Sequence, residues 1–132
     1  MRSRRLALVG AAGVAAVAAA HGSAQPQTTV PTVVVPIRIT LTDSAFRVSP
    51  KTAPRAALGR FILDNRGTKR HAFKLEWTRT AYGVQKGFTK ALMPGKRAEV
   101  LLYLDYRGRI AYRGSLPADR SKASMKGFIR VY

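Results

Sequence analysis

The sequence predicts an all-β domain with the architecture of an antiparallel sandwich. Its 132 residues suit a single domain. Beyond residue 36, apolar and polar side chains alternate in about seven short runs with the period of two that is typical of strands. Gly, Pro, Asn and Asp separate these runs, and no long amphipathic helical pattern interrupts them. Short strands with turn residues between them are typical of a sandwich.

Residues 1–24 predict a secretory signal peptide. Three arginines precede an Ala- and Gly-rich apolar run from Leu6 to Ala20, and small residues follow. This run is shorter than the about 20 residues of a membrane span, which favours a cleaved signal. An uncleaved anchor helix is the alternative. Cleavage after Ala24 and cleavage after Ala20 both fit, and Ser3-Arg4-Arg5 leaves twin-arginine export open. We expect a secreted or periplasmic protein with no transmembrane span after cleavage.

The strands are expected in the following order. Residues 25–36 (QPQTTVPTVVVP) contain Pro and Thr without a helical period, which predicts an extended tether to a domain over residues 37–132. Residues 37–41 alternate, and residues 45–48 continue an extended segment. Residues 57–64 predict the next strand, and the Asn65-Arg66-Gly67 turn ends it.

The second half continues this pattern. Residues 71–77 alternate and place four side chains on one predicted core face: His71, Phe73, Leu75 and Trp77. Residues 78–89 lack a period and predict a long loop, with a short helix inside it as the alternative. Residues 97–104 follow a Pro94-Gly95 turn and predict a strand with a buried centre. A final pair of strands, residues 110–114 and 127–132, flanks a polar loop.

Composition limits the chemistry of the chain. The absence of cysteine excludes disulfides, thiol catalysis, Cys-ligated zinc and the thiolate of a type 1 copper centre. The sequence shows no nucleophile motif, no carboxylate pair and no phosphate-binding Gly loop, so we expect no enzyme activity.

The charge balance is strongly basic, with a formal net charge of +18. The signal contains three of the 24 basic residues, which leaves 21 against six acidic side chains. Such a field attracts acidic head groups, anionic polymers or nucleic acid. A solvated cationic face without a partner is the alternative reading.

Four segments in the same order resemble the cupredoxins, the blue-copper proteins. They are ITLTDSAFRVSP, GRFILDNRGTKRHAFKLE, LMPGKRAEVLLYL and the terminal loop that contains Ser115-Leu116-Pro117 and Met125-Lys126-Gly127. The resemblance runs from about Pro36 to Tyr132. It implies a Greek-key β-sandwich of about seven to eight strands.

The same resemblance implies a degenerate copper site. The first His ligand corresponds to His71, the Cys to Gly114, the second His to Asp119 and the Met to Met125. Because the thiolate and one imidazole are missing, we expect no cofactor and a non-catalytic binding or accessory module. The alternative is a copper carrier or electron-transfer protein that uses His71 and Met125.

Each of these residues also has an ordinary structural reading. His71 could hydrogen-bond Asp119 across the former copper position, Asp119 could pair with Arg120 or Lys122, and Met125 could be a core residue. After cleavage at Ala20, His21 and His71 would form a copper brace, which is a further alternative.

We expect a monomer with an anionic surface or an acidic protein as its partner, and no specific nucleic acid. The basic residues expected near the former metal position are the candidate anion-binding residues: Lys69, Arg70, Arg113, Arg120, Lys122 and Lys126.

Overall fold

The structure is a computed structural model that describes residues 32–132. One sheet contains β1 (Val34–Leu41), β2 (Phe46–Ser49), β4 (Ala57–Asn65) and β9 (Arg97–Leu104). A second sheet contains β3 (Thr52–Ala53), β5 (His71–Leu75), β8 (Phe88–Leu92), β10 (Gly108–Gly114) and β11 (Lys126–Val131). The remaining elements are a hairpin of β6 (Thr78–Arg79) and β7 (Val84–Gln85), and a 3-10 helix, η1 (Ala123–Met125).

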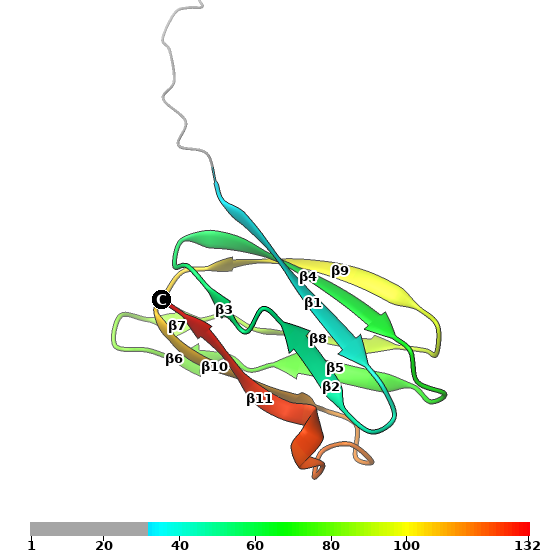
Figure 1. Ribbon diagram of the computed structural model, residues 1–132. Coiled ribbons are helices and arrows are strands. Elements are labelled where there is room, and N and C mark those ends of the chain that lie inside the picture. The colour runs from blue at the N-terminus through cyan, green and yellow to red at the C-terminus, as the bar shows by residue number, and fades with distance from the viewer. Residues whose placement is uncertain (1–31) are drawn as a thin grey trace, which may run out of the picture. The chain divides into compact units, whose positions relative to one another are not determined.

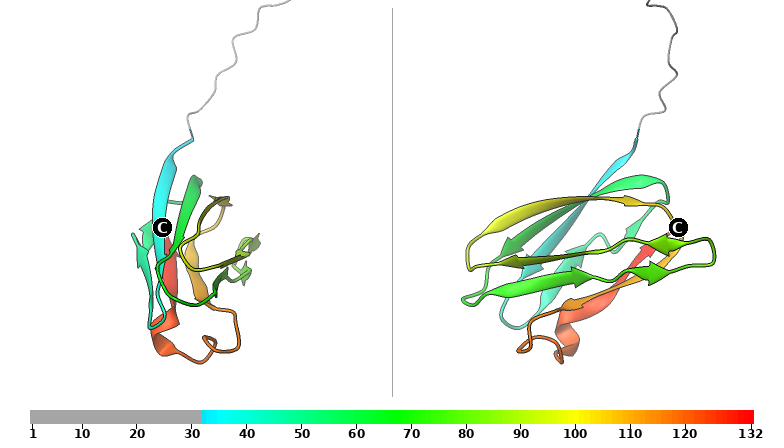
Figure 2. Two further views of the ribbon diagram at one scale, coloured as in Figure 1. Left: turned by 90° about the vertical axis from the view of Figure 1, so that its right-hand side faces the viewer. Right: turned by 180° about the vertical axis from the view of Figure 1, so that it is seen from behind.

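The two larger sheets form the two layers of a sandwich (Figures 1 and 2). The strand orders are β2–β1–β4–β9 and β3–β11–β10–β5–β8. Residues 32–132 contain eleven strands, of which β3, β6 and β7 have two residues each, so eight longer strands build the sandwich. The predicted all-β sandwich is confirmed. No helix within residues 32–132 has the length and apolar character needed to span a bilayer.

Two strand pairings are parallel, which corrects the expectation of a fully antiparallel sandwich. β1 pairs with β4 in parallel from Val34↔Leu58 to Leu41↔Asn65, and β11 pairs with β3 in parallel. The chain between β1 and β4 passes through β2 and then joins the second sheet at β3. β4 therefore returns to the first sheet in the same direction as β1. This pairing brings the ends of β1 and β4 together at one end of the sandwich.

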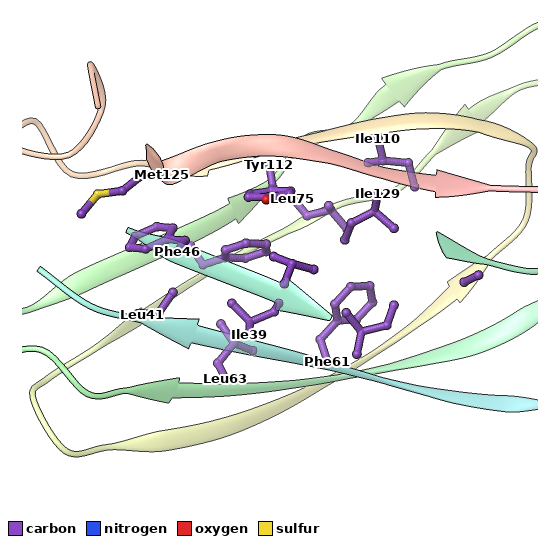
Figure 3. Close-up of a cluster of buried hydrophobic side chains, with 14 of the residues drawn as sticks. Ile39, Leu41, Phe46, Phe61, Leu63, Leu75, Ile110, Tyr112, Met125 and Ile129 are labelled. Carbon is purple, nitrogen blue, oxygen red and sulfur yellow. The ribbon is translucent and has the colours of Figure 1, made fainter. Parts of the chain in front are cut away.

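The apolar core lies between the two sheets. Alternation along β1 and β4 directs Ile39 and Phe61 inward, and β5 contributes Phe73 with its ring stacked 5.4 Å from that of Tyr112. Figure 3 shows these layers of side chains facing one another, with Met125 beside Phe46 at one end. Burial of such side chains contributes about 1.5–3 kcal/mol each.

The segment after β5 differs from its prediction. β5 ends at Leu75, the backbone N–H of Glu76 donates to Ala111 O, and Trp77 is 61% exposed instead of lying in the core. The predicted loop over residues 78–89 contains the β6–β7 hairpin and the start of β8. Phe88 in β8 packs against Phe61 with ring centroids 5.1 Å apart. This aromatic contact anchors the start of β8 against the core.

Two further strands also differ from their predictions, one in its burial and one in its first residue. β9 lacks a buried centre, because it is an edge strand and only one of its faces, including Val100, packs against the core. β1 begins at Val34, so the last residues of the predicted tether belong to the first strand. The predicted signal peptide, the rest of the tether and His21 lie outside the described residues.

Two leucines test the assignment of inner and outer faces. Leu75 is 0% exposed and Leu101, on the outer face of β9, is 61% exposed. We expect Leu75→Ala to lower the free energy of unfolding by about 2–5 kcal/mol, because it leaves a cavity. Leu101→Ala should change it by no more than about 0.5 kcal/mol. Equal losses, measured by chemical denaturation, would contradict the assignment.

Candidate functional site

Three loops meet the start of β5 at one end of the sandwich, which we call the His71 end. They are residues 42–45 after β1, residues 66–70 after β4, and residues 115–125 between β10 and β11. Backbone hydrogen bonds join two of them to the strands: Arg66 N donates to Leu41 O and Ser115 N donates to Ala72 O. The hydroxyl of Ser124 also donates to the carbonyl of Ser44.

His71 is held between two carboxylates. Its Nδ1 lies 2.7 Å from Asp119 Oδ2, and its Nε2 lies 2.8 Å from Asp43 Oδ1. The imidazole side chain is 2% exposed. A neutral ring would direct a lone pair at one carboxylate oxygen, so the geometry fits an imidazolium that donates from both nitrogens. The predicted hydrogen bond between His71 and Asp119 is confirmed.

Asp43 organises the loop that leads to His71. Its carboxylate accepts hydrogen bonds from the hydroxyl of Thr68 at 2.6 Å, from the backbone N–H of Thr68 at 3.0 Å and from that of Lys69 at 3.3 Å. The Thr68 hydroxyl first, and then the His71 ring, hold the pKa of Asp43 well below its ordinary value. Asp43 is therefore a carboxylate under all but strongly acidic conditions.

Asp119 is the buried partner in the pair. Its side chain is 4% exposed, and a turn fixes its backbone, since Asp119 N donates to Leu116 O and Lys122 N donates to Asp119 O. The Lys122 ammonium lies 3.7 Å from Asp119 Oδ1 and donates to Asp43 O at 3.2 Å. The predicted contact with Lys122 is confirmed. Arg120 instead directs its guanidinium toward Ser115 O, at 3.4 Å.

Asn65 fixes the neighbouring loops from beneath. It is 0% exposed, and its Nδ2 donates to Lys69 O and to Leu92 O at 2.9 and 2.8 Å. Its Oδ1 accepts from Gly67 N at 2.9 Å. Its backbone carbonyl accepts from Gly95 N, in the predicted Pro-Gly turn, where Gly95 has φ of 78°. A single amide thus joins the ends of β4 and β8 to the loop before His71.

Two glycines allow the carboxylates to approach. A Cβ at Gly67 would overlap Asp43 Oδ1 and lie 3.0 Å from His71 Nε2. A Cβ at Gly114 would lie 2.8 Å from the Asp119 Cβ and 3.3 Å from Phe46 Cε2. Asp119 and Phe46 therefore occupy the space into which a side chain at position 114 would extend.

Met125 belongs to the core. It is 0% exposed within the apolar cluster, and Figure 3 shows its side chain next to Phe46. The Phe46 ring also contacts the His71 ring edge-on, with centroids 5.8 Å apart. The expectation that Met125 closes the end of the core is confirmed.

The fold is that of known copper proteins, although no protein-family model and no curated protein matches the sequence. Auracyanin A, described as a "blue" copper protein from Chloroflexus aurantiacus, superposes with a TM-score of 0.55 and 12% identity over 75% of this chain and 99% of that one. Rusticyanin from Thiobacillus ferrooxidans superposes with a TM-score of 0.59 and 16% identity, over 77% of this chain and 79% of that one. Blue copper oxidase from Nitrosomonas europaea superposes with a TM-score of 0.54 and 16% identity, over 81% of this chain and 48% of the oxidase chain. The described domain has the cupredoxin fold. At these identities, the similarity concerns the fold alone.

The side chains of this cupredoxin-like site do not fit a type 1 copper ion. A thiolate is absent from the sequence, and position 114 has no room for one while Asp119 and Phe46 are in place. Both nitrogens of His71 are engaged by carboxylates that lie on opposite edges of its ring, so the three groups do not converge on one ion. Among residues 32–132, no three His, Cys, Asp or Glu side chains are placed to hold a metal.

The predicted anion-binding residues divide into two groups. Lys69, Arg70, Arg120 and Lys122 lie in the loops of the His71 end, and Arg113 and Lys126 lie opposite each other on β10 and β11. Arg113 donates from Nε to Glu76 Oε1 at 2.7 Å, so one of the six is neutralised on the sheet face. Lys122 is exposed but contacts the Asp119 carboxylate and the Asp43 backbone carbonyl, and the other four are exposed.

Sequence reasoning missed Asp43, the second partner of His71. Asp43 follows β1 by two residues, and Thr68 follows β4 by three. Because β1 and β4 are parallel neighbours, the loops after their last residues meet. An expectation of antiparallel strands alone places these loops at opposite ends, so the contact was not inferred.

Acid should weaken the domain through Asp43. A pKa that is lower in the folded state than the unfolded value of about 3.9 makes the free energy of unfolding rise with pH. The contribution of Asp43 is complete above about pH 5 and is lost as the pH falls through the folded pKa. We expect Asp43→Asn to be less stable than the unmodified protein at about pH 5 and to lose less stability on acidification.

Unfolding free energies measured by denaturant titration across this range provide the test. Asp105→Asn is the matched control, because Asp105 is exposed and forms no ion pair within residues 32–132. A decline with acid that is equally steep in Asp43→Asn and the unmodified protein would contradict the role of Asp43.

Proposed function

We propose that this protein is an exported, non-catalytic binding module that engages an anionic partner through its basic surface, acting as a monomer. One observation carries the proposal: within residues 32–132, five of the 21 Lys and Arg side chains form ion pairs with carboxylates. Two of the six carboxylates are occupied by His71. Most of the positive charge therefore faces solvent and attracts anions.

The former metal position supports a binding role over electron transfer. A type 1 centre needs a thiolate and two imidazoles, whereas this end of the sandwich contains one imidazole between two aspartates. Copper binding at His71 would require one aspartate to leave a ring nitrogen and the ring to lose a proton. Met125 lies within the apolar core. We therefore favour the binding module over the copper carrier.

The basic pole, defined as Lys69, Arg70 and Arg120, is the proposed contact region at the His71 end. These three side chains are exposed and project from two loops that the Asp119–His71–Asp43 contacts hold in place. Rigid loops lose less conformational entropy on binding than flexible ones, which favours affinity. In this proposal, the histidine and its aspartates stabilise a surface that binds anions.

Titration of the full chain with polyglutamate tests this function. We expect binding that weakens steeply between about 50 and about 200 mM salt. The triple variant Lys69→Gln/Arg70→Gln/Arg120→Gln should bind more weakly than the control Arg55→Gln/Arg79→Gln/Lys86→Gln, which removes the same charge from exposed residues at the opposite end. Absence of binding at low salt would overturn the proposed function, and equal losses would overturn the assignment to the pole.

A further inference from the structure

The outer face of the second sheet carries a row of cations along two neighbouring strands. Arg109 on β10 lies directly opposite Arg130 on β11, and Arg113 lies directly opposite Lys126. We call these four residues the basic stripe. Lys74 on β5 is the cross-strand partner of Arg113 on its other side, which widens the stripe at that end.

Like charges opposite each other in a sheet are destabilising unless an anion lies between them. The carboxylate of Glu76 lies 2.7 Å from Arg113 and 3.7 Å from Lys74 and offsets the repulsion at one end. Within residues 32–132, no carboxylate forms an ion pair with Arg109 or Arg130. The pair at the far end of the stripe is thus an uncompensated site for an anion.

Phe128 separates the two cation pairs and orients one of them. It pairs with Ala111 across the strands, is 48% exposed, and has the guanidinium of Arg109 4.1 Å above its ring centroid. This cation–π contact restrains Arg109 on the sheet face. Because the guanidinium covers one face of the ring, the aromatic serves to position a cation more than to stack on a base or enter a bilayer.

The spacing favours a chain of anions over a single ion. Arg109 and Arg113 are four residues apart on one strand, which corresponds to about 13 Å, whereas strands lie about 4.8 Å apart. One phosphate can bridge the two members of a pair, but only a polymer reaches both pairs. The far pair itself lines a surface hollow, together with Arg107 and Tyr132, at the end of the sandwich away from His71.

We propose that the basic stripe binds a linear polymer that carries phosphate groups along its length and has no nucleobases, lying over the β10–β11 seam. This inference rests on the proposed function, since it names the class of anionic partner and a surface for it. The polymer runs from the hollow at Arg107, across Arg109 and Arg130, past Phe128 to Arg113 and Lys126. From there the stripe continues toward the loops of the basic pole.

Linear inorganic polyphosphate is the probe for this surface, with inorganic phosphate as the short ligand. We expect the full chain to bind long polyphosphate much more tightly than phosphate. Arg109→Gln/Arg130→Gln should weaken the binding about tenfold and lower the slope of log K against log salt by about two. The control Arg38→Gln/Arg47→Gln removes two exposed charges from the other sheet and should weaken binding much less.

The outcomes separate this inference from the proposed function. Equal weakening in both variants would overturn the stripe while leaving an anion-binding module. Tighter binding to vesicles with acidic lipids, or to single-stranded DNA at equal phosphate concentration, would overturn the choice of partner. If the unmodified protein binds neither polyglutamate nor polyphosphate, the proposed function itself is overturned. Unfolding free energies of each variant show that the comparison is made between folded proteins.

Discussion

The two hydrogen bonds from His71 to Asp43 and Asp119 are the constraint on which the His71 end of this sandwich depends. The three residues come from the loop after β1, the start of β5 and the loop after β10. Asp43 also holds Thr68, and Lys122 bridges both aspartates. Buried ionic groups are costly unless their partners are satisfied. Asp43 accepts from Thr68, Lys69 and His71, and Asp119 has His71 at 2.7 Å and the Lys122 ammonium at 3.7 Å.

These hydrogen bonds join the terminal loop and the loop after β1 to the start of β5. In a cupredoxin, a metal cation joins ligands from the strand that begins with the first His and from the terminal loop. Here the His71 ring takes the central place, and Asp119 from the terminal loop is one of its two hydrogen-bond partners. Gly114 and Phe46 complete the replacement, because the space for a thiolate contains packed carbon atoms. The exposed loops above the site are held by hydrogen bonds to one another and to the strands.

The sequence alone predicted most of the fold and half of the site. Alternation and turn residues predicted the long strands, and the order of the motifs predicted that His71 meets Asp119. Three features depended on tertiary contacts that have no local signal. Trp77 follows the inward pattern of β5 but lies beyond its end, Leu101 looks apolar enough for a core but lies on an edge strand, and Asp43 reaches His71 only through a parallel pairing. Likewise, the like-charge pairs of the stripe appear only once the register of β10 and β11 is known.

The protonation of His71 is the central claim, because it separates a proton-bridged site from a metal site. Nitrogen-15 NMR of the imidazole at about pH 6, with and without added Cu(I), measures it directly. We predict that both ring nitrogens carry hydrogen-bonded protons, that their signals are lost in His71→Gln, and that an equimolar amount of copper leaves them unchanged. Loss of either N–H on addition of copper, with the metal bound to the ring, would contradict the account and make this domain a copper protein.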